Sequence, residues 1–117
     1  RHIEEGFYVS PDNILGRLLN KRKPRGLIGS NMSFSRKAIE DLNGFDEDFI
    51  LPAIGEDADL NWRFRAAGYQ FRSVRNLAIQ YHLFHKENWK DQSENAALME
   101  LKIAKNEFRC KNGLKKM

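Results

Sequence analysis

The 117-residue sequence has a single cysteine, Cys110, and only three prolines. One thiol allows no internal disulfide and no thiolate metal cluster, which fits a reducing, cytoplasmic setting. We expect Cys110 to pack quietly or to lie exposed near a helix end, since no thiol-activating neighbour can be identified. No apolar run approaches the roughly 18 residues that a membrane-spanning helix requires. The sequence therefore predicts a cytoplasmic protein, with the inner face of the membrane as the one membrane surface to consider.

The residues that are plentiful are those of one soluble globular domain. Hydrophobic residues make up 41% of the chain and charged residues 31%, with a formal net charge of +4. Basic residues gather in two stretches, 17–25 and 102–116. Such stretches can bind nucleic acid or anionic lipid, but a lysine-rich helix end is more often a solvated end that the helix dipole favours. We therefore expect no nucleic-acid partner.

Apolar spacing and turn residues predict an α/β or α+β chain with few strands for its helices. Helices are expected over residues 10–19, 35–44, 56–67 and 93–113. Strands are expected over residues 6–10, 27–34, 69–74 and 77–82. Two helices have a clear predicted core face, made by Leu60, Phe64 and Ala67 in one and by Ala97, Leu101, Ala104 and Phe108 in the other. So short a sheet would be easiest to understand as the edge of a larger one.

Three polar segments follow one another at the ends of these elements. They read Gly-Ser-Asn-Met-Ser-Phe at 29–34, Asn-Gly-Phe-Asp-Glu-Asp-Phe at 43–49 and Gly-Glu-Asp at 55–57. The pair Ala67-Gly68 ends the helix that the third segment begins. Acids in a first helical turn also suit the helix dipole, so the third segment alone is weak. Three ordered segments at this spacing are much more informative.

Together the segments resemble the C-terminal half of the inverting family 2 glycosyltransferases and the related galactosyltransferase C-terminal region. The resemblance covers roughly residues 6–95. It implies an α/β fold, the C-terminal part of a GT-A (Rossmann-like) domain with a short mixed sheet and flanking helices. It also implies transfer of a hexose or N-acetylhexosamine from a sugar nucleotide, such as a UDP-sugar, to a glycan acceptor in polysaccharide biosynthesis.

The carboxylates of Glu56 and Asp57 suit the chemistry that this resemblance implies. In an inverting transfer the acceptor hydroxyl must lose its proton as it attacks, and a carboxylate within hydrogen-bond reach can take that proton. By resemblance Asp57 is this base, and Glu56 binds the acceptor. The plainer alternative is that both acids only complement the positive end of a helix.

Other polar residues receive roles from the same resemblance. The resemblance places three residues on the donor side, Gly29, Asn31 and Ser33. The same residues are also typical of a buried strand in which the glycine permits a bulge. Asp46 is implied on the acceptor side, or else makes local turn bonds. Trp62 is a candidate for stacking on the acceptor sugar, and core packing is the alternative.

Metal binding is predicted from histidines rather than from the two D-x-D strings. Residues i and i+2 of a helix point about 200° apart, so Asp57 and Asp59 diverge, and Asp59 is expected to face solvent or cap the helix. The resembled family uses a histidine in the region of His82 and His85 as a metal ligand. Oxygen-rich sites with one imidazole suit Mn²⁺ or Mg²⁺, with His85 as first choice and His82 as second.

The nucleotide-binding part of such an enzyme is not visible in this sequence. No glycine-rich phosphate loop and no strand-terminal D-x-D precede residue 6, and that part would need on the order of 100 further residues. We therefore expect a fragment, inactive alone, whose N-terminal half is missing and whose exposed apolar surface would favour dimerisation. Residues 1–92 would form the acceptor-binding and base-bearing part, and residues 93–117 an amphipathic helix with a basic tail.

Two other classes of function remain open at this level. A basic interaction module could use the lysine-rich ends to bind nucleic acid or an anionic surface. A small metal-dependent hydrolase could use Glu56, Asp57, His82 and His85, provided that these four form a complete metal site.

Overall fold

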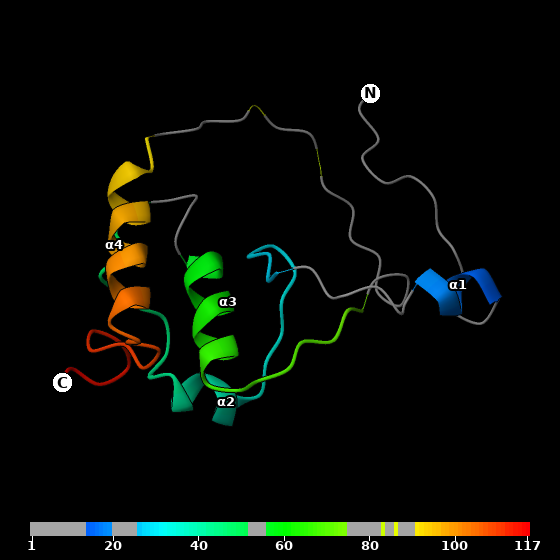
Figure 1. Cartoon of the computed structure of the whole chain (residues 1–117), viewed down its shortest axis with the longest axis horizontal. Helices are drawn as coiled ribbons and strands as arrows, with labels where there is room; N and C mark the ends of the chain where they lie inside the picture. The colour runs from blue at the N-terminus through cyan, green and yellow to red at the C-terminus, as the bar shows by residue number, and fades with distance from the viewer. Residues whose placement is uncertain (1–13, 20–25, 52–55, 75–82, 84–85, 87–90) are drawn as a thin grey trace. The chain divides into compact units, whose positions relative to one another are not determined.

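The computed structural model describes residues 14–19, 26–51, 56–74, 83, 86 and 91–117. In this part of the chain it has four α-helices, α1 Ile14–Leu19, α2 Arg36–Asp41, α3 Glu56–Ala66 and α4 Ser93–Ala104 (Figure 1). The chain divides into two compact units, one of Arg1–Arg25 with Phe71–Phe84 and one of Gly26–Gln70 with His85–Met117. Helix α1 belongs to the first unit, and α2, α3 and α4 belong to the second. The boundary predicted after residue 92 falls inside the second unit.

No β-strand occurs among the described residues, which have only an isolated bridge between Asn112 and Lys116. The strands predicted at 27–34 and 69–74 are therefore wrong. The first segment turns back on itself, with the Asn31 N–H donating to the Ile28 carbonyl at 2.9 Å. Its preceding N–H groups bond to side chains of α3 instead of to another strand. The strands predicted at 6–10 and 77–82 lie outside the described residues, so the sheet and the GT-A fold stay predictions.

Helix α2 begins and ends where the sequence indicates. The Ser35 hydroxyl accepts a hydrogen bond from the Ala38 N–H at 3.2 Å, an N-cap that satisfies one of the free N–H groups of the first turn. Asn43 and Gly44 follow the helix with φ of 67° and 84°. The Gly44 N–H donates to the Ile39 carbonyl at 2.8 Å, which closes the helix end. The predicted capping serine and terminating glycine are both confirmed.

Helix α3 also matches its predicted core face. Leu60 and Phe64 are buried, Ala67 is half-buried, and Gly68 ends the turn with φ of 83°. The ring of Phe64 packs between those of Phe34 and Tyr69, with centroids 5.6 and 5.5 Å away. These contacts fix α3 against the segment that precedes α2.

Helix α4 differs from the prediction in length and in the face that it buries. It ends at Ala104, because Asn106 adopts a left-handed conformation with φ of 52° and the chain turns away. Ala97, Leu101 and Ala104 of the predicted core face are exposed, and Phe108 is half-buried beyond the helix. The buried residues of α4 are instead Asn95 and Lys102. Apolar spacing gave the wrong face because the second unit buries polar side chains that have hydrogen-bonding partners.

Apart from glycines, the described part buries five apolar and six polar or charged residues. The apolar ones are Ala38, Leu42, Leu60, Phe64 and Cys110. The polar and charged ones are Asn43, Asp46, Asp59, Arg63, Asn95 and Lys102. Cys110 is 1% exposed, so its expected packing role is confirmed and its expected place near a helix end is not. Burial also raises the pKa of the Cys110 thiol, which keeps it protonated.

Candidate active site

The first turn of α3 lies against the segment that contains Gly29. The Gly29 N–H donates to Oδ2 of Asp57 at 3.1 Å, and the Leu27 N–H donates to Oδ1 of Asn61 at 3.4 Å. Asp57 and Asn61 are four residues apart, so they share one face of the helix. Two side chains of α3 thus hold alternate N–H groups of the segment that leads into the turn at residues 28–31. Asn61 was missed in the sequence, where its spacing from Asp57 was the available signal.

Both carboxylates of the Gly-Glu-Asp segment face the backbone at Gly29. A Cβ built at Gly29 would lie 3.8 Å from Oε1 of Glu56 and 3.9 Å from Oδ2 of Asp57. Glu56 is exposed and Asp57 is half-buried. The structure therefore brings together Gly29, Glu56 and Asp57, which the sequence assigned to one site. This proximity across 28 positions in sequence is the main geometric feature of the candidate site.

The Asp57 carboxylate is held by one backbone donor on each oxygen. Oδ2 accepts from Gly29, and Oδ1 accepts from the Ala58 N–H at 2.7 Å. Each carboxylate oxygen has about two acceptor positions, so one further donor can approach each oxygen. The carboxylate also lies at the N-terminus of α3, where the helix dipole favours negative charge. Asp57 is therefore held in one orientation and still has room for a further hydrogen-bond donor on each oxygen.

The other residues of the donor-side prediction lie on the same segment. Asn31 and Ser33 are both exposed. The Asn31 N–H closes the turn to Ile28, which places Asn31 two residues beyond the contact between Gly29 and Asp57. Their contact with a sugar donor remains a prediction.

Asp59 lies on the opposite side of α3 from Asp57 and is buried. The expectation that Asp59 faces solvent or caps the helix is wrong, since the residue is 1% exposed. Its Oδ2 accepts from Nε of Arg63 at 2.6 Å, and its Oδ1 accepts from Nε1 of Trp62 at 3.1 Å. Burial raises the pKa of Asp59 to about 6, although the charge and hydrogen bond of Arg63 oppose that rise. Trp62 is half-buried with its indole N–H bonded in this way, so stacking on a sugar remains a prediction.

Arg63 was missed by sequence reasoning and is one of the most buried side chains in the described part. Its Nη1 donates to the carbonyls of Leu42 and Gly44 at 3.1 and 3.0 Å, and its Nη2 donates to Gly44 at 3.0 Å. Together with Asp59, these carbonyls satisfy the charge of a guanidinium that is 0% exposed. Arg63 thus fastens the end of α2 to α3. The spacing of four residues from Asp59 was the signal in the sequence.

Asp46, predicted on the acceptor side, has a side chain that is fully buried. Its Oδ2 accepts from Nζ of Lys102 at 2.6 Å, and its Oδ1 accepts from the Asp48 N–H at 3.2 Å. A direct contact with an acceptor would require this pair to open, so we leave Asp46 out of the binding site. The alternative given by the sequence, local turn bonds, describes the contact with Asp48.

The metal centre predicted from the sequence lies outside the described residues. No group of three His, Cys, Asp or Glu side chains in this part of the chain could hold a metal ion. His82 and His85 lie outside the described residues, so their assignment as ligands stays a prediction. In the same part of the chain, no helix has the length and apolar character to cross a membrane.

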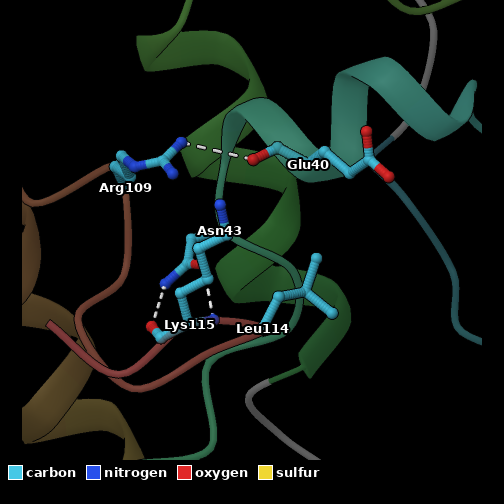
Figure 2. Close-up of a pocket in the computed structure, with 5 residues that line it drawn as sticks. All are labelled: Glu40, Asn43, Arg109, Leu114 and Lys115. Carbon is cyan, nitrogen blue, oxygen red and sulfur yellow. Dashed lines mark hydrogen bonds between the residues drawn. The ribbon is translucent and has the colours of Figure 1, made fainter.

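A cavity of about 320 Å³ lies elsewhere, beside the end of α2. Its lining residues are Glu40, Asn43, Arg109, Leu114 and Lys115. Figure 2 shows Arg109 donating to the Glu40 carbonyl, at 3.2 Å, and Asn43 bonded twice to the backbone of Lys115, at 2.8 and 2.9 Å. None of these residues belongs to α3 or to the segment around Gly29. The cavity is therefore separate from the candidate site.

Comparison with protein families identifies the family that these residues belong to. A family model described as the N-terminal domain of galactosyltransferase matches residues 17–86. The chain belongs to this galactosyltransferase family. The match includes α2, α3 and all three polar segments, so the predicted likeness to galactosyltransferases is confirmed and the chain carries a glycosyltransferase domain. Membership of family 2 and the position in a C-terminal half are not supported, and the family description names an N-terminal domain.

Searches among curated proteins and among solved structures found no significant match.

Proposed function

We propose that this galactosyltransferase-like domain transfers a hexose or N-acetylhexosamine from a UDP-sugar to a hydroxyl of a glycan acceptor, with inversion. Asp57 is the general base and Glu56 binds a neighbouring acceptor hydroxyl. The observation that carries the proposal is the convergence of both carboxylates on the Gly29 backbone. It supports a site because an exposed and a half-buried acid meet beside an open glycine segment within the family match.

The proposed reaction is a single displacement at the anomeric carbon. The acceptor oxygen attacks from the face opposite the nucleotide, its proton passes to Asp57, and the bond to the nucleotide phosphate oxygen breaks. The electron pair of that bond leaves with the nucleoside diphosphate, and the anomeric configuration inverts. A positioned base contributes about 10²–10⁴-fold to the rate of such a step.

The backbone bonds to Asp57 support the role of a base that must keep one orientation. The N–H groups of Gly29 and Ala58 hold the two oxygens, so little reorientation is needed when a hydroxyl arrives. Asn61 adds to this by holding the Leu27 N–H on the same helix face. Glu56 is exposed at the start of α3, so its carboxylate can accept hydrogen bonds from other hydroxyls of the acceptor.

The nucleotide site and the divalent ion belong to the proposal only as far as the sequence supports them. We assign the donor side to Gly29, Asn31 and Ser33, and expect a further part of the same enzyme to hold the nucleotide. Mn²⁺ or Mg²⁺ would be bound with His85, or else His82, and would stabilise the charge of the leaving diphosphate. Because the described residues offer no metal centre, no step above depends on that ion.

Replacing Asp57 by Asn in the full-length protein tests the base assignment. Transfer should fall by about 10²–10⁴-fold, while the affinity for the sugar nucleotide is unchanged, since Asn keeps the shape but takes no proton. Radiolabelled transfer and donor titration calorimetry measure the two quantities. Glu94→Gln is the matched control, because Glu94 is an exposed acid in the first turn of α4. Donor affinity that falls in step with turnover would count against Asp57 as the base.

A further inference from the structure

The loop of residues 45–48, here called the acid loop, is bound by the end of the chain. Nζ of Lys102 lies 2.6 Å from Oδ2 of Asp46 and 2.6 Å from Oδ2 of Asp48. The side chains of Lys102 and Asp46 are 6% and 0% exposed. A single buried ammonium therefore joins two carboxylates of the acid loop to α4.

Residues 105–117, here called the C-terminal segment, bind the same loop from another side. The Asn112 carbonyl accepts from the Glu47 N–H at 2.8 Å, and Nδ2 of Asn112 donates to Oδ1 of Asp48 at 2.9 Å. Nζ of Lys116 lies 2.5 Å from Oε2 of Glu47. Every acid of the loop thus accepts from a donor in α4 or in the C-terminal segment, and the loop cannot move without opening several of these bonds.

Lys102 keeps its charge although it is buried. Burial by itself lowers the pKa of a lysine, but the hydrogen bonds that Lys102 donates to Asp46 and Asp48 outweigh it, so the pKa of Lys102 is raised. The ammonium therefore sits between the two carboxylates as a permanent cation at neutral pH. Its Nζ also lies over the ring of Phe49, 5.8 Å from the ring centroid, which adds a cation–π contact.

The acid loop is in turn tied to the helix that carries Asp57. Gly44, directly before the loop, accepts two hydrogen bonds from Arg63 of α3. Arg63 pairs with Asp59, two residues after Asp57. Lys102 is thus connected through buried charges and carbonyls to the start of α3.

We propose that Lys102 is a positioning residue: as the internal cation of the acid loop it holds, through Gly44 and the Arg63–Asp59 pair, the start of α3 that carries Glu56 and Asp57. This rests on the proposed function, because it assumes that an acceptor binds at Glu56 and Asp57. Lys102 and the C-terminal segment lie beyond residues 17–86, so they are an addition to the family match.

Lys102→Met in the full-length protein tests the proposal against Lys105→Met, which removes an exposed lysine one turn further on. Lys102→Met should raise the acceptor KM about tenfold, with donor affinity unchanged, because misplaced contacts cost binding and turnover. Amide exchange at Glu47 and Leu114 should also become about tenfold faster. The Glu47 N–H joins the acid loop to the Asn112 carbonyl, and the Leu114 N–H bonds to the Asn43 carbonyl just before the loop. Lys105→Met should change neither quantity.

A second variant separates positioning from folding. Lys102→Met with Asp46→Asn removes both charges of the fully buried pair, so stability should largely return. The acceptor KM should stay raised, because Asp48 has still lost its ammonium. An acceptor KM that returns with stability, or unchanged amide exchange in Lys102→Met, would overturn the proposal. Absence of transfer in the unchanged protein would instead refute the proposed function, and amide exchange would still decide whether Lys102 holds the loop.

Discussion

Asp57 and Asp59 lie two residues apart on α3 and have opposite surroundings. Asp57 is half-buried, accepts two backbone N–H groups and faces the open segment at Gly29. Asp59 is buried and pairs with the fully buried guanidinium of Arg63. Two helical positions rotate a side chain by about 200°, which is enough to send one acid to the surface site and the other to the core.

The same contrast separates two regions of the second unit. The region around Gly29, Glu56 and Asp57 leaves carboxylates accessible, as a reacting site must. The region around Arg63 and Lys102 pairs each buried carboxylate with a buried cation, Asp59 with Arg63 and Asp46 with Lys102. A structural centre requires such pairs, because an unpaired buried charge is very costly. Residue type alone does not distinguish the two regions; the counter-charge does.

The largest effect should come from breaking the buried region at Arg63. Arg63→Met leaves the buried Asp59 without its counter-charge and removes a donor from two carbonyls, so the free energy of unfolding should fall by about 3–5 kcal/mol. Arg36→Met is the control, since Arg36 forms the same four-residue pairing with Glu40 at the surface. That exposed pair should contribute about 0–1 kcal/mol. Urea unfolding of both variants measures the difference, and equal losses would contradict the contrast between buried and exposed pairs.

A smaller effect is expected where the C-terminal segment meets the end of α2. A Cβ at Gly113 would lie 2.0 Å from the Asn43 carbonyl oxygen and 2.7 Å from Sγ of Cys110. Gly113→Ala must therefore shift backbone, at about 1–3 kcal/mol of stability.

Gly68→Ala is the control for Gly113→Ala, because nothing lies within 4 Å of a Cβ at Gly68 and only its φ of 83° is unfavourable. Its loss should be about 1 kcal/mol. Thermal unfolding of the two variants would disagree with the structure if Gly68→Ala were the more damaging.

The smallest and most specific effect concerns pH. Because burial raises the pKa of Asp59 from 3.8 to about 6, the folded chain holds a proton that the unfolded chain releases in between. The contribution of Asp59 to stability is therefore full below pH 3.8, falls as pH rises towards 6 and is constant above. Carbon-13 NMR of the side-chain carboxyl should give Asp59 a midpoint near 6. A midpoint at or below 3.8 would show that Arg63 outweighs burial.

The sequence predicted the elements whose signals are local. The Ser35 cap, the stops at Gly44 and Gly68, and the burial of Leu60 and Phe64 follow from spacing and backbone preference within one helix. Gly29 and Asp57 were assigned to one site only through a family resemblance, and their direct contact was not predicted, since 28 positions separate the two residues.

The remaining features depend on contacts between distant residues. The sequence predicted Lys102 as part of a solvated basic helix end. Its partners Asp46 and Asp48 could not be recognised, because they lie more than 50 positions away in sequence. The segment 27–34 was predicted as a strand because its own residues do not show that the chain turns at Ile28–Asn31 or that the N–H groups of Leu27 and Gly29 bond to side chains of α3. The end of α4 was placed too late because Asn106 was not recognised as a left-handed residue.

The most direct test compares Asp57→Asn with Asp59→Asn in one preparation of the full-length protein. Transfer rate and the free energy of unfolding are measured for both. We predict that Asp57→Asn loses transfer with only a small loss of stability, since one partly exposed backbone N–H loses its acceptor. Asp59→Asn should lose much more stability, because Arg63 remains buried and charged without its counter-ion. Transfer that survives in Asp57→Asn, or a loss of stability as large as that of Asp59→Asn, would contradict the division of α3 into a reacting face and a structural face.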